Sequence, residues 1–161
     1  MDRIRKILAP TDLSDLSRIG VGSAIALARS QGAELIVLYV IAIADDWTSP
    51  YDQIVPVRRL FEESRRRLDE FLRANFAEAL SGVTVRQEVE IGNPYRNIVA
   101  RAADEKVDLI VMSTHGRTGL AHMLMGSVTE KVVGRAPCPV LSVPARAAHV
   151  GAAPEPAIAI A

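Results

Sequence analysis

Short, almost continuous apolar runs recur along the chain, separated by longer segments in which apolar residues return every three or four positions. The runs occupy residues 5–10, 34–41, 107–113 and 139–144. Runs of this length and composition are typical of strands that are covered on both faces, as in a parallel sheet. We therefore predict a strand at each of these four places.

Residues 83–91 follow a different pattern, because mostly apolar residues stand at the odd positions and polar residues at the even ones. Such alternation places the two kinds of side chain on opposite faces of a strand. We predict a half-exposed strand here, and the edge of the sheet is the position that suits it.

A helix is predicted over residues 15–31. Ser14 is a favourable N-cap residue, and Asp15 would lie at the positive end of the helix dipole. Apolar and small residues follow at helical spacing, and Gly32 is suited to end the helix.

Residues 57–79 form the longest helical pattern, with one apolar face and many charges of both signs on the remaining surface. Opposite charges three and four positions apart stabilise one another on a helix surface. We interpret these charges as a solvated, self-paired face rather than as a patch that binds nucleic acid.

Two more helices are predicted nearer the end of the chain. Asn93 and Pro94 signal the start of one, as N-cap and first helical residue. The other is expected from about Ser127, before the last apolar run. Strands and helices therefore alternate along the chain.

This alternation predicts an α/β fold, a single Rossmann-like domain over residues 1–144 with helices on both faces of a five-stranded parallel sheet. Right-handed crossovers and an edge position for the polar third strand favour the strand order 3-2-1-4-5. Residues 145–161 are rich in Ala and Pro and lack periodicity. We expect them to form a disordered tail.

Composition narrows the class of protein. The 161 residues include 19 basic and 19 acidic ones, a balance that argues against a broad basic surface for nucleic acid. No apolar run approaches the length of a membrane span, and the first residues lack the long apolar region of a signal peptide. Cys138 is the only cysteine, which excludes an intrachain disulfide. We expect a cytoplasmic protein without nucleic-acid or membrane partners.

The predicted strand order reverses direction between the first and fourth strands, where ligands bind in open α/β sheets. Two loops meet there. The first is residues 9–12, and the second follows the fourth strand with a histidine, an arginine and two glycines. The candidate binding residues in these loops are Ala9, Pro10, Thr11, Asp12, Met112, Ser113, His115, Gly116, Arg117 and Gly119.

Gly126 and Ser127 lead into the last predicted helix, whose first backbone N–H groups have no intrahelical partner and suit an anion. Ser127 and Thr129 would add hydroxyl groups. A structural alternative explains the same residues, because Ser127 and Glu130 have the spacing of a capping box. Neither the P-loop nor the G-x-G-x-x-G pattern is present, so both readings stay open.

Several segments together resemble the universal stress protein family. They are KILAPTDLS, LIVLYVI, DLIVMSTHGRTGL, GSVTEKVV and APCPVLSV, and the resemblance runs from about Arg3 to Val143. ATP-binding members of that family carry G-x-x-G-x9-G-[ST]. This chain has Gly116, Gly126 and Ser127 at the matching positions, and Ser113 in place of the first glycine.

The resemblance implies that ATP is the ligand, with Mg²⁺ held through the phosphates and not by direct protein ligands. It places Pro10, Thr11 and Asp12 at the adenosine end and Val40 against adenine. It places Met112, His115 and Gly116 beside the ribose and phosphates, and the phosphates themselves against four residues: Gly126, Ser127, Val128 and Thr129. It also implies a homodimer formed through the last strand, at about Pro139 to Val143.

Three functions follow as hypotheses. The first is an ATP-binding, dimeric regulatory protein of the stress response. The second is a slow ATPase or phosphotransferase, and weak ATP hydrolysis stays open. We assign no catalytic residue, because the sequence offers no convincing third partner that would make His115 an acid–base catalyst. The third is a dimeric interaction module that binds no nucleotide.

Overall fold

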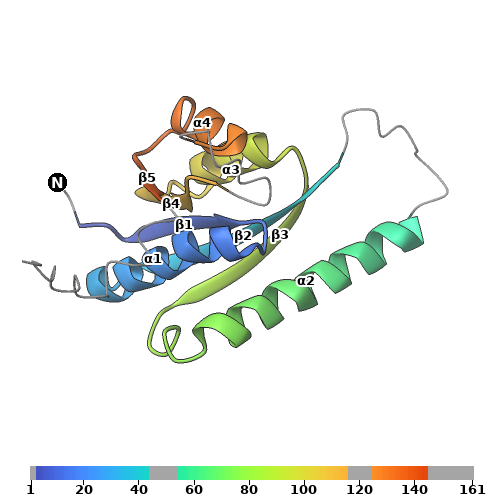
Figure 1. The fold of residues 1–161 in the computed structure, drawn as a ribbon, viewed down its shortest axis with the longest axis horizontal. Coiled ribbons are helices and arrows are strands. Elements are labelled where there is room, and N and C mark those ends of the chain that lie inside the picture. Colours follow the sequence, from blue (N-terminus) through green and yellow to red (C-terminus); the bar gives the residue numbers. More distant parts are fainter. Residues whose placement is uncertain (1–2, 44–53, 116–124, 145–161) are drawn as a thin grey trace, which may run out of the picture.

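The computed structural model describes residues 3–43, 54–115 and 125–144. Its elements form one sheet between two pairs of helices (Figure 1). In chain order they are β1 (Lys6–Thr11), α1 (Asp15–Gln31), β2 (Glu34–Ala42), α2 (Ile54–Phe76), β3 (Val85–Gly92), α3 (Pro94–Asp104), β4 (Leu109–Ser113), α4 (Ser127–Val133) and β5 (Val140–Val143). Among the described residues, no helix is long and apolar enough to cross a membrane.

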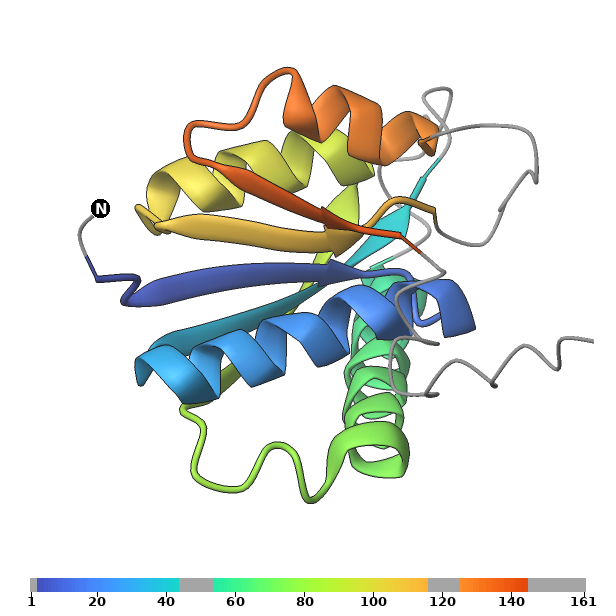
Figure 2. The ribbon, with the colours of Figure 1, turned by 60° about the vertical axis from the view of Figure 1, so that its left-hand side comes forward.

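The five strands are all parallel and lie in the order β3-β2-β1-β4-β5. This confirms the predicted α/β class, the Rossmann-like topology and the edge position of the polar strand β3. α1 and α2 lie on one face of the sheet, and α3 and α4 lie together on the other (Figure 2). The predicted tail, residues 145–161, lies outside the described residues.

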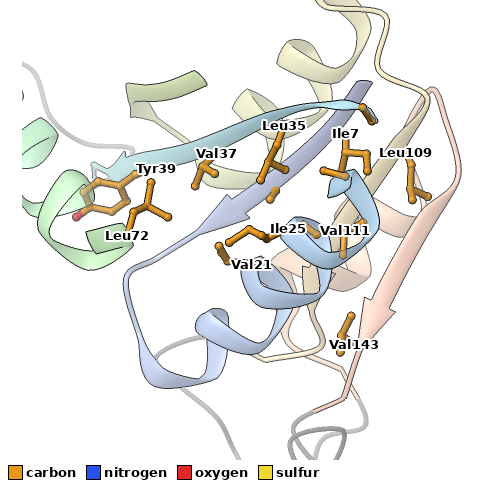
Figure 3. Close-up of a cluster of buried hydrophobic side chains, with 14 of the residues drawn as sticks. Ile7, Val21, Ile25, Leu35, Val37, Tyr39, Leu72, Leu109, Val111 and Val143 are labelled. Atoms are coloured by element: carbon orange, nitrogen blue, oxygen red, sulfur yellow. The ribbon is translucent and has the colours of Figure 1, made fainter. Parts of the chain in front are cut away.

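Each central strand contributes side chains to two separate cores. Ile7 and Ala9 of β1 pack with α1 and α2, whereas Leu8 between them packs with α3 and α4. In the first core, Val21 and Ile25 of α1 lie against the sheet (Figure 3). Since both faces are covered, both odd and even positions must be apolar, which explains the continuous runs in the sequence.

The ends of α1 follow the predicted signals. Ser14 Oγ accepts a hydrogen bond of 3.1 Å from the Ser17 N–H. Gly32 has a φ of 62°, and its N–H is directed to the carbonyls of Ala28 and Arg29. Glycine adopts this left-handed conformation at little energetic cost, so Gly32 can end the helix here.

α2 was predicted over residues 57–79 but spans Ile54–Phe76. The carbonyls of the turn that follows it accept hydrogen bonds from Arg29 of α1, at 2.8 Å for Ala79 and 3.0 Å for Ser81. These bonds hold the last predicted turn outside the helix. The charged face is paired with itself as predicted, through the ion pairs Arg58–Glu62, Asp69–Arg73 and Arg66–Glu70.

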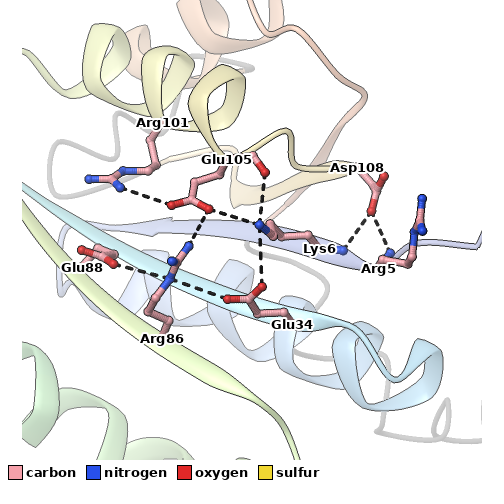
Figure 4. A network of polar contacts seen from close by, with 8 residues as sticks. All are labelled: Arg5, Lys6, Glu34, Arg86, Glu88, Arg101, Glu105 and Asp108. Carbon is pink, nitrogen blue, oxygen red and sulfur yellow. Dashed lines mark hydrogen bonds and ion pairs between the residues drawn. The ribbon is translucent and has the colours of Figure 1, made fainter.

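The polar face of β3 is covered by part of α3. Arg86 of β3 lies 2.7 Å from Glu105, the residue that follows α3, and Lys6 of β1 lies 3.2 Å from the same carboxylate (Figure 4). Arg101 of α3 pairs with Glu90 of β3 at 2.6 Å. These ion pairs join the sheet edge to the helix, so the alternating pattern marks a charged interface as well as an exposed face.

The stability of the fold should therefore fall at acid pH. Arg86 and then Lys6 hold the pKa of Glu105 at about 2, against an ordinary value of 4.5. The backbone N–H groups of Arg5 and Lys6 lower the pKa of Asp108. A carboxyl with a depressed pKa in the folded state stabilises it fully above its ordinary pKa. That contribution is lost as the pH falls from about 4.5 towards 2.

We expect the thermal midpoint, followed by circular dichroism, to fall over this pH window. The fall should be shallower in Glu105→Gln, which has no carboxyl to titrate at this position. Glu62→Gln, at an exposed ion pair of α2, serves as the control and should keep the wild-type slope. Equal slopes in all three proteins would contradict the role assigned to Glu105.

Candidate functional site

A cleft of about 550 Å³ opens at the carboxyl ends of β1 and β4. This volume is within the range of small-molecule sites. β1 lies between β2 and β4 in the sheet, so the cleft occupies the switch point of the strand order. Its lining comes from β1, β2 and β4, from the β1–α1 turn and the first turn of α1, from α3 and α4, and from the segments that flank β4 and α4.

Most of the residues predicted to bind a ligand line this cleft. They are Pro10, Thr11, Asp12, Val40, Met112, Ser113, His115, Gly126, Ser127, Val128 and Thr129. Ala9 is not among them, because its side chain is buried in the core under α1. Gly116, Arg117 and Gly119 lie outside the described residues.

The turn from β1 into α1 is closed by its own side chains. Thr11 Oγ1 lies 2.9 Å from Ser17 Oγ and accepts a hydrogen bond from the Leu13 N–H. Asp12 Oδ1 accepts another from the Ser14 N–H, at 3.0 Å. Leu13 has a φ of 64°, a strained value for a leucine that these bonds help to maintain. Thr11 and Asp12 therefore shape this wall of the cleft.

Ser113, the residue at the position of the first motif glycine, directs its hydroxyl group towards α1. Ser113 Oγ donates to the carbonyl of Leu16 at 2.6 Å and accepts from the N–H of Gly20 at 2.9 Å. Both groups belong to the backbone of the helix on the far side of the strand. The hydroxyl group is thus used between β4 and α1 rather than offered to the cleft.

α4 begins one residue earlier than the predicted capping box requires. Gly126 is the N-cap, Ser127 is the first helical residue, and no side chain among the described residues caps the helix. The Gly126 N–H bonds instead to the carbonyl of Thr114 at 2.6 Å. This bond fixes the chain entry into the helix, so the structural alternative of a Ser127–Glu130 capping box is wrong. Asn93 is the N-cap of α3 as predicted, but its side chain makes no capping bond.

The hydroxyl groups of Ser127 and Thr129 differ in their surroundings. Ser127 is exposed at the cleft. Thr129 is buried, and its Oγ1 donates to the carbonyl of Ser113 at 3.0 Å. Because a hydroxyl has a single proton, Thr129 has none left to donate to a ligand in this arrangement. Ser127 keeps that capacity.

His115 also lines the cleft, and its Nδ1 lies 3.0 Å from Thr114 Oγ1. Within the described part of the chain, no group of three His, Cys, Asp or Glu side chains is arranged to hold a metal ion. The side chains that line the cleft are otherwise apolar, hydroxyl-bearing or, at Asp12, a carboxylate. This set suits an organic ligand with one polar end.

The sequence-based prediction missed part of the lining. The missed residues come from the first turn of α1, the carboxyl end of β2 and the start of α3: Ser17, Leu38, Tyr39, Ile41, Ala42, Pro94 and Ile98. The carboxyl end of β2 could have been included, because it meets the same sheet edge as β1. The contribution of α3 depends on its packing beside α4, which no local pattern encodes.

Comparison with known proteins agrees with this arrangement. A model of the universal stress protein family matches residues 3–144. The chain is 38% identical to universal stress protein MJ0531 of Methanocaldococcus jannaschii, over 86% of this chain and 81% of the relative. Its fold is similar to that of the universal stress protein UspA from Lactobacillus plantarum, with a TM-score of 0.74, 25% identity, and coverage of 89% of this chain and 99% of that one.

Two other solved structures with the same fold carry a nucleotide. One is a universal stress protein in complex with cAMP, with a TM-score of 0.60 and 24% identity over 89% of this chain and 99% of that one. The other is a universal stress protein family protein of Arabidopsis thaliana with AMP bound, with a TM-score of 0.55 and 20% identity over 87% and 91%. From the family match, the sequence identity and the shared fold, we conclude that this chain belongs to the universal stress protein family.

Proposed function

We propose that this protein binds ATP in the cleft at the carboxyl ends of β1 and β4 and acts as a dimeric regulatory protein of the stress response. The observation that carries the proposal is the cleft itself, which lies at the switch point and has the volume of a small-molecule site. The adenine nucleotides in two proteins of the same fold support the choice of ligand.

The two ends of the cleft have different chemistry. Val40 of β2 and Ile98 of α3 form an apolar wall, which suits an adenine ring. Gly126 and Ser127 form the other end, where the first N–H groups of α4 have no partner within the helix. Such groups suit phosphate oxygens, and Ser127 adds an exposed hydroxyl group.

Ser113 is compatible with nucleotide binding in this arrangement. Its hydroxyl group is bonded to the α1 backbone, so the added side chain takes up space beside Gly20 rather than in the cleft. The proposal includes Mg²⁺, held through the phosphates of the nucleotide. A bound Mg²⁺ would neutralise part of the phosphate charge.

Isothermal titration with ATP and MgCl₂ tests the proposal. We expect saturable binding below millimolar ligand, and we expect protein purified from cells to release ATP or ADP when it is denatured and chromatographed. Absence of both would instead favour an interaction module without nucleotide. ADP formation by the same sample, measured over hours, separates a binding protein from a slow ATPase.

The dimer is proposed to form through β5, which is an edge of the sheet. An edge strand presents unpaired backbone groups to a partner strand. Leu141 of β5 and Val133 of α4 are large apolar side chains exposed beside this edge. A second copy of the chain would cover both features.

Substitution of Leu141 tests this interface. We expect light scattering after gel filtration to show a dimer for the wild type and a shift to monomer for Leu141→Asp. Ala74→Asp, at an exposed position of α2, introduces the same charge elsewhere and should remain dimeric. A monomeric wild type would contradict the proposed assembly without bearing on the nucleotide site.

A further inference from the structure

Tyr95, the second residue of α3, is surrounded by three cationic side chains. The guanidinium of Arg96 lies 5.8 Å from the centre of its ring, and that of Arg135 lies 5.5 Å from it. The Lys131 ammonium lies 5.3 Å from the same centre. Arg96 comes from α3, whereas Lys131 and Arg135 come from α4 and the turn after it. Two helices thus bring three like charges together.

Within the part of the chain that the structure describes, two of these cations lack the carboxylate partners that other basic residues have. Lys131 and Arg135 take part in no ion pair within the described residues, unlike Arg66 or Arg101. Contacts between an exposed cation and an aromatic ring contribute only about 0.5–1 kcal/mol each. Like charges held close together repel, so an anion among them would relieve the repulsion.

Arg96 also contacts the hydroxyl group at the outer end of the tyrosine ring. Arg96 Nε donates a hydrogen bond of 3.1 Å to the Tyr95 hydroxyl oxygen. This bond, and then the charges of Arg96, Arg135 and Lys131, lower the pKa of the Tyr95 phenol. A bound anion with oxygen atoms would meet the same three charges, together with a hydroxyl group that can donate to it.

The cluster lies beside the cleft and separate from it. Pro94 lines the cleft and Tyr95 follows it, while Lys131 stands one helical turn after Ser127. α3 and α4 lie side by side on one face of the sheet, so the cations of both helices share one surface (Figures 1 and 2). Neither Tyr95 nor the three cations line the cleft.

We propose that Arg96, Lys131 and Arg135, gathered around Tyr95, form a second anion site that binds a dianionic phosphate group. A doubly charged phosphate group offers several acceptor oxygens, and guanidinium groups bind such oxygens with charge-assisted hydrogen bonds. The phosphate can be free or can belong to a nucleotide whose base lies in the neighbouring cleft. The site needs no nucleotide in the cleft, so it stands independently of the proposed function.

Carbon-13 labelling of the tyrosine rings gives a direct readout. The chain has three tyrosines, and Tyr95→Phe identifies the signal of Tyr95. Titration with inorganic phosphate should move that signal in a saturable way. A second titration with adenosine 3′,5′-bisphosphate, compared with AMP, tests a phosphate carried by a nucleotide. If only the bisphosphate moves the Tyr95 signal, the site serves a nucleotide phosphate.

Lys131→Gln with Arg135→Gln should weaken phosphate binding by about tenfold or more, because two charge-assisted contacts are lost. Both side chains are exposed, so the double variant should fold normally. Arg65→Gln with Arg67→Gln, on the exposed face of α2, removes the same charge and should bind phosphate as the wild type does. An unmoved Tyr95 signal with both probes, or equal losses in the two double variants, would overturn the proposal.

Discussion

Gly20→Ala is expected to destabilise the protein by about 3 kcal/mol, a large share of the stability of a domain of this size. A Cβ atom at Gly20 would lie 2.5 Å from the backbone nitrogen of Ser113 and 2.8 Å from the backbone carbon of Met112. Both atoms belong to β4, the buried strand beside β1, and cannot move away as a flexible side chain would. Either α1 must rise from the sheet or β4 must shift.

Gly22→Ala is the matched control, because it lies on the same helix two residues away. Among the described residues, its added Cβ atom would meet only the ring of Phe76, at 3.3 Å. Alanine favours a helix over glycine by about 1 kcal/mol, so this variant should be as stable as the wild type or slightly more so. Urea unfolding followed by circular dichroism measures both effects.

A Gly20→Ala protein as stable as Gly22→Ala would contradict the close approach of α1 and β4. Ser113→Gly tests which atoms are responsible. If the backbone contacts cause the destabilisation, adding Ser113→Gly to Gly20→Ala should restore little stability, because the nearest atoms of β4 remain in place. A full rescue would show that the Ser113 side chain alone makes the position tight.

The strands, their order and the ends of α1 could be predicted because each depends on local composition or on general rules for parallel sheets. The continuous apolar runs reflect two covered faces. Ser14 acts through its own side chain and Gly32 through its own backbone conformation. The special role of Gly20 could not be predicted in this way. A glycine is required at this position because β4, which lies far along the sequence, packs directly against it. In the helical pattern of α1, Gly20 cannot be distinguished from any other small residue.

The candidate site likewise has parts that could be predicted from the sequence and parts that could not. The loop after β1 and the Gly126–Ser127 pair were identifiable, because the strand order places them at one edge. The capping-box pattern was misleading, since the Gly126 N–H bonds to Thr114 and moves the N-cap by one residue. The Ser113 side chain faces α1 because of its position in the alternation of β4 and because the α1 backbone bonds to its hydroxyl group. The motif alone shows neither of these.

Ser127→Asp should weaken ATP binding by about a hundredfold, or roughly 2.7 kcal/mol, if the start of α4 holds the phosphates. Ser127 is exposed at the cleft, so a carboxylate there would face the phosphate charge directly. The same carboxylate lies in the first turn of a helix, where a negative charge is favourable for folding. The variant should therefore be stable while it loses affinity, which separates binding from folding.

Two comparisons make this result specific to phosphate. Ser127→Asn has the size of the aspartate without its charge and should bind ATP within about tenfold of the wild type. Adenosine carries no phosphate, so isothermal titration should give it the same affinity for the wild type and for Ser127→Asp. If ATP binds both variants and the wild type equally, the phosphates lie elsewhere. An equal loss for adenosine would mean that the substitution distorts the whole cleft, because only a charge effect distinguishes the two ligands.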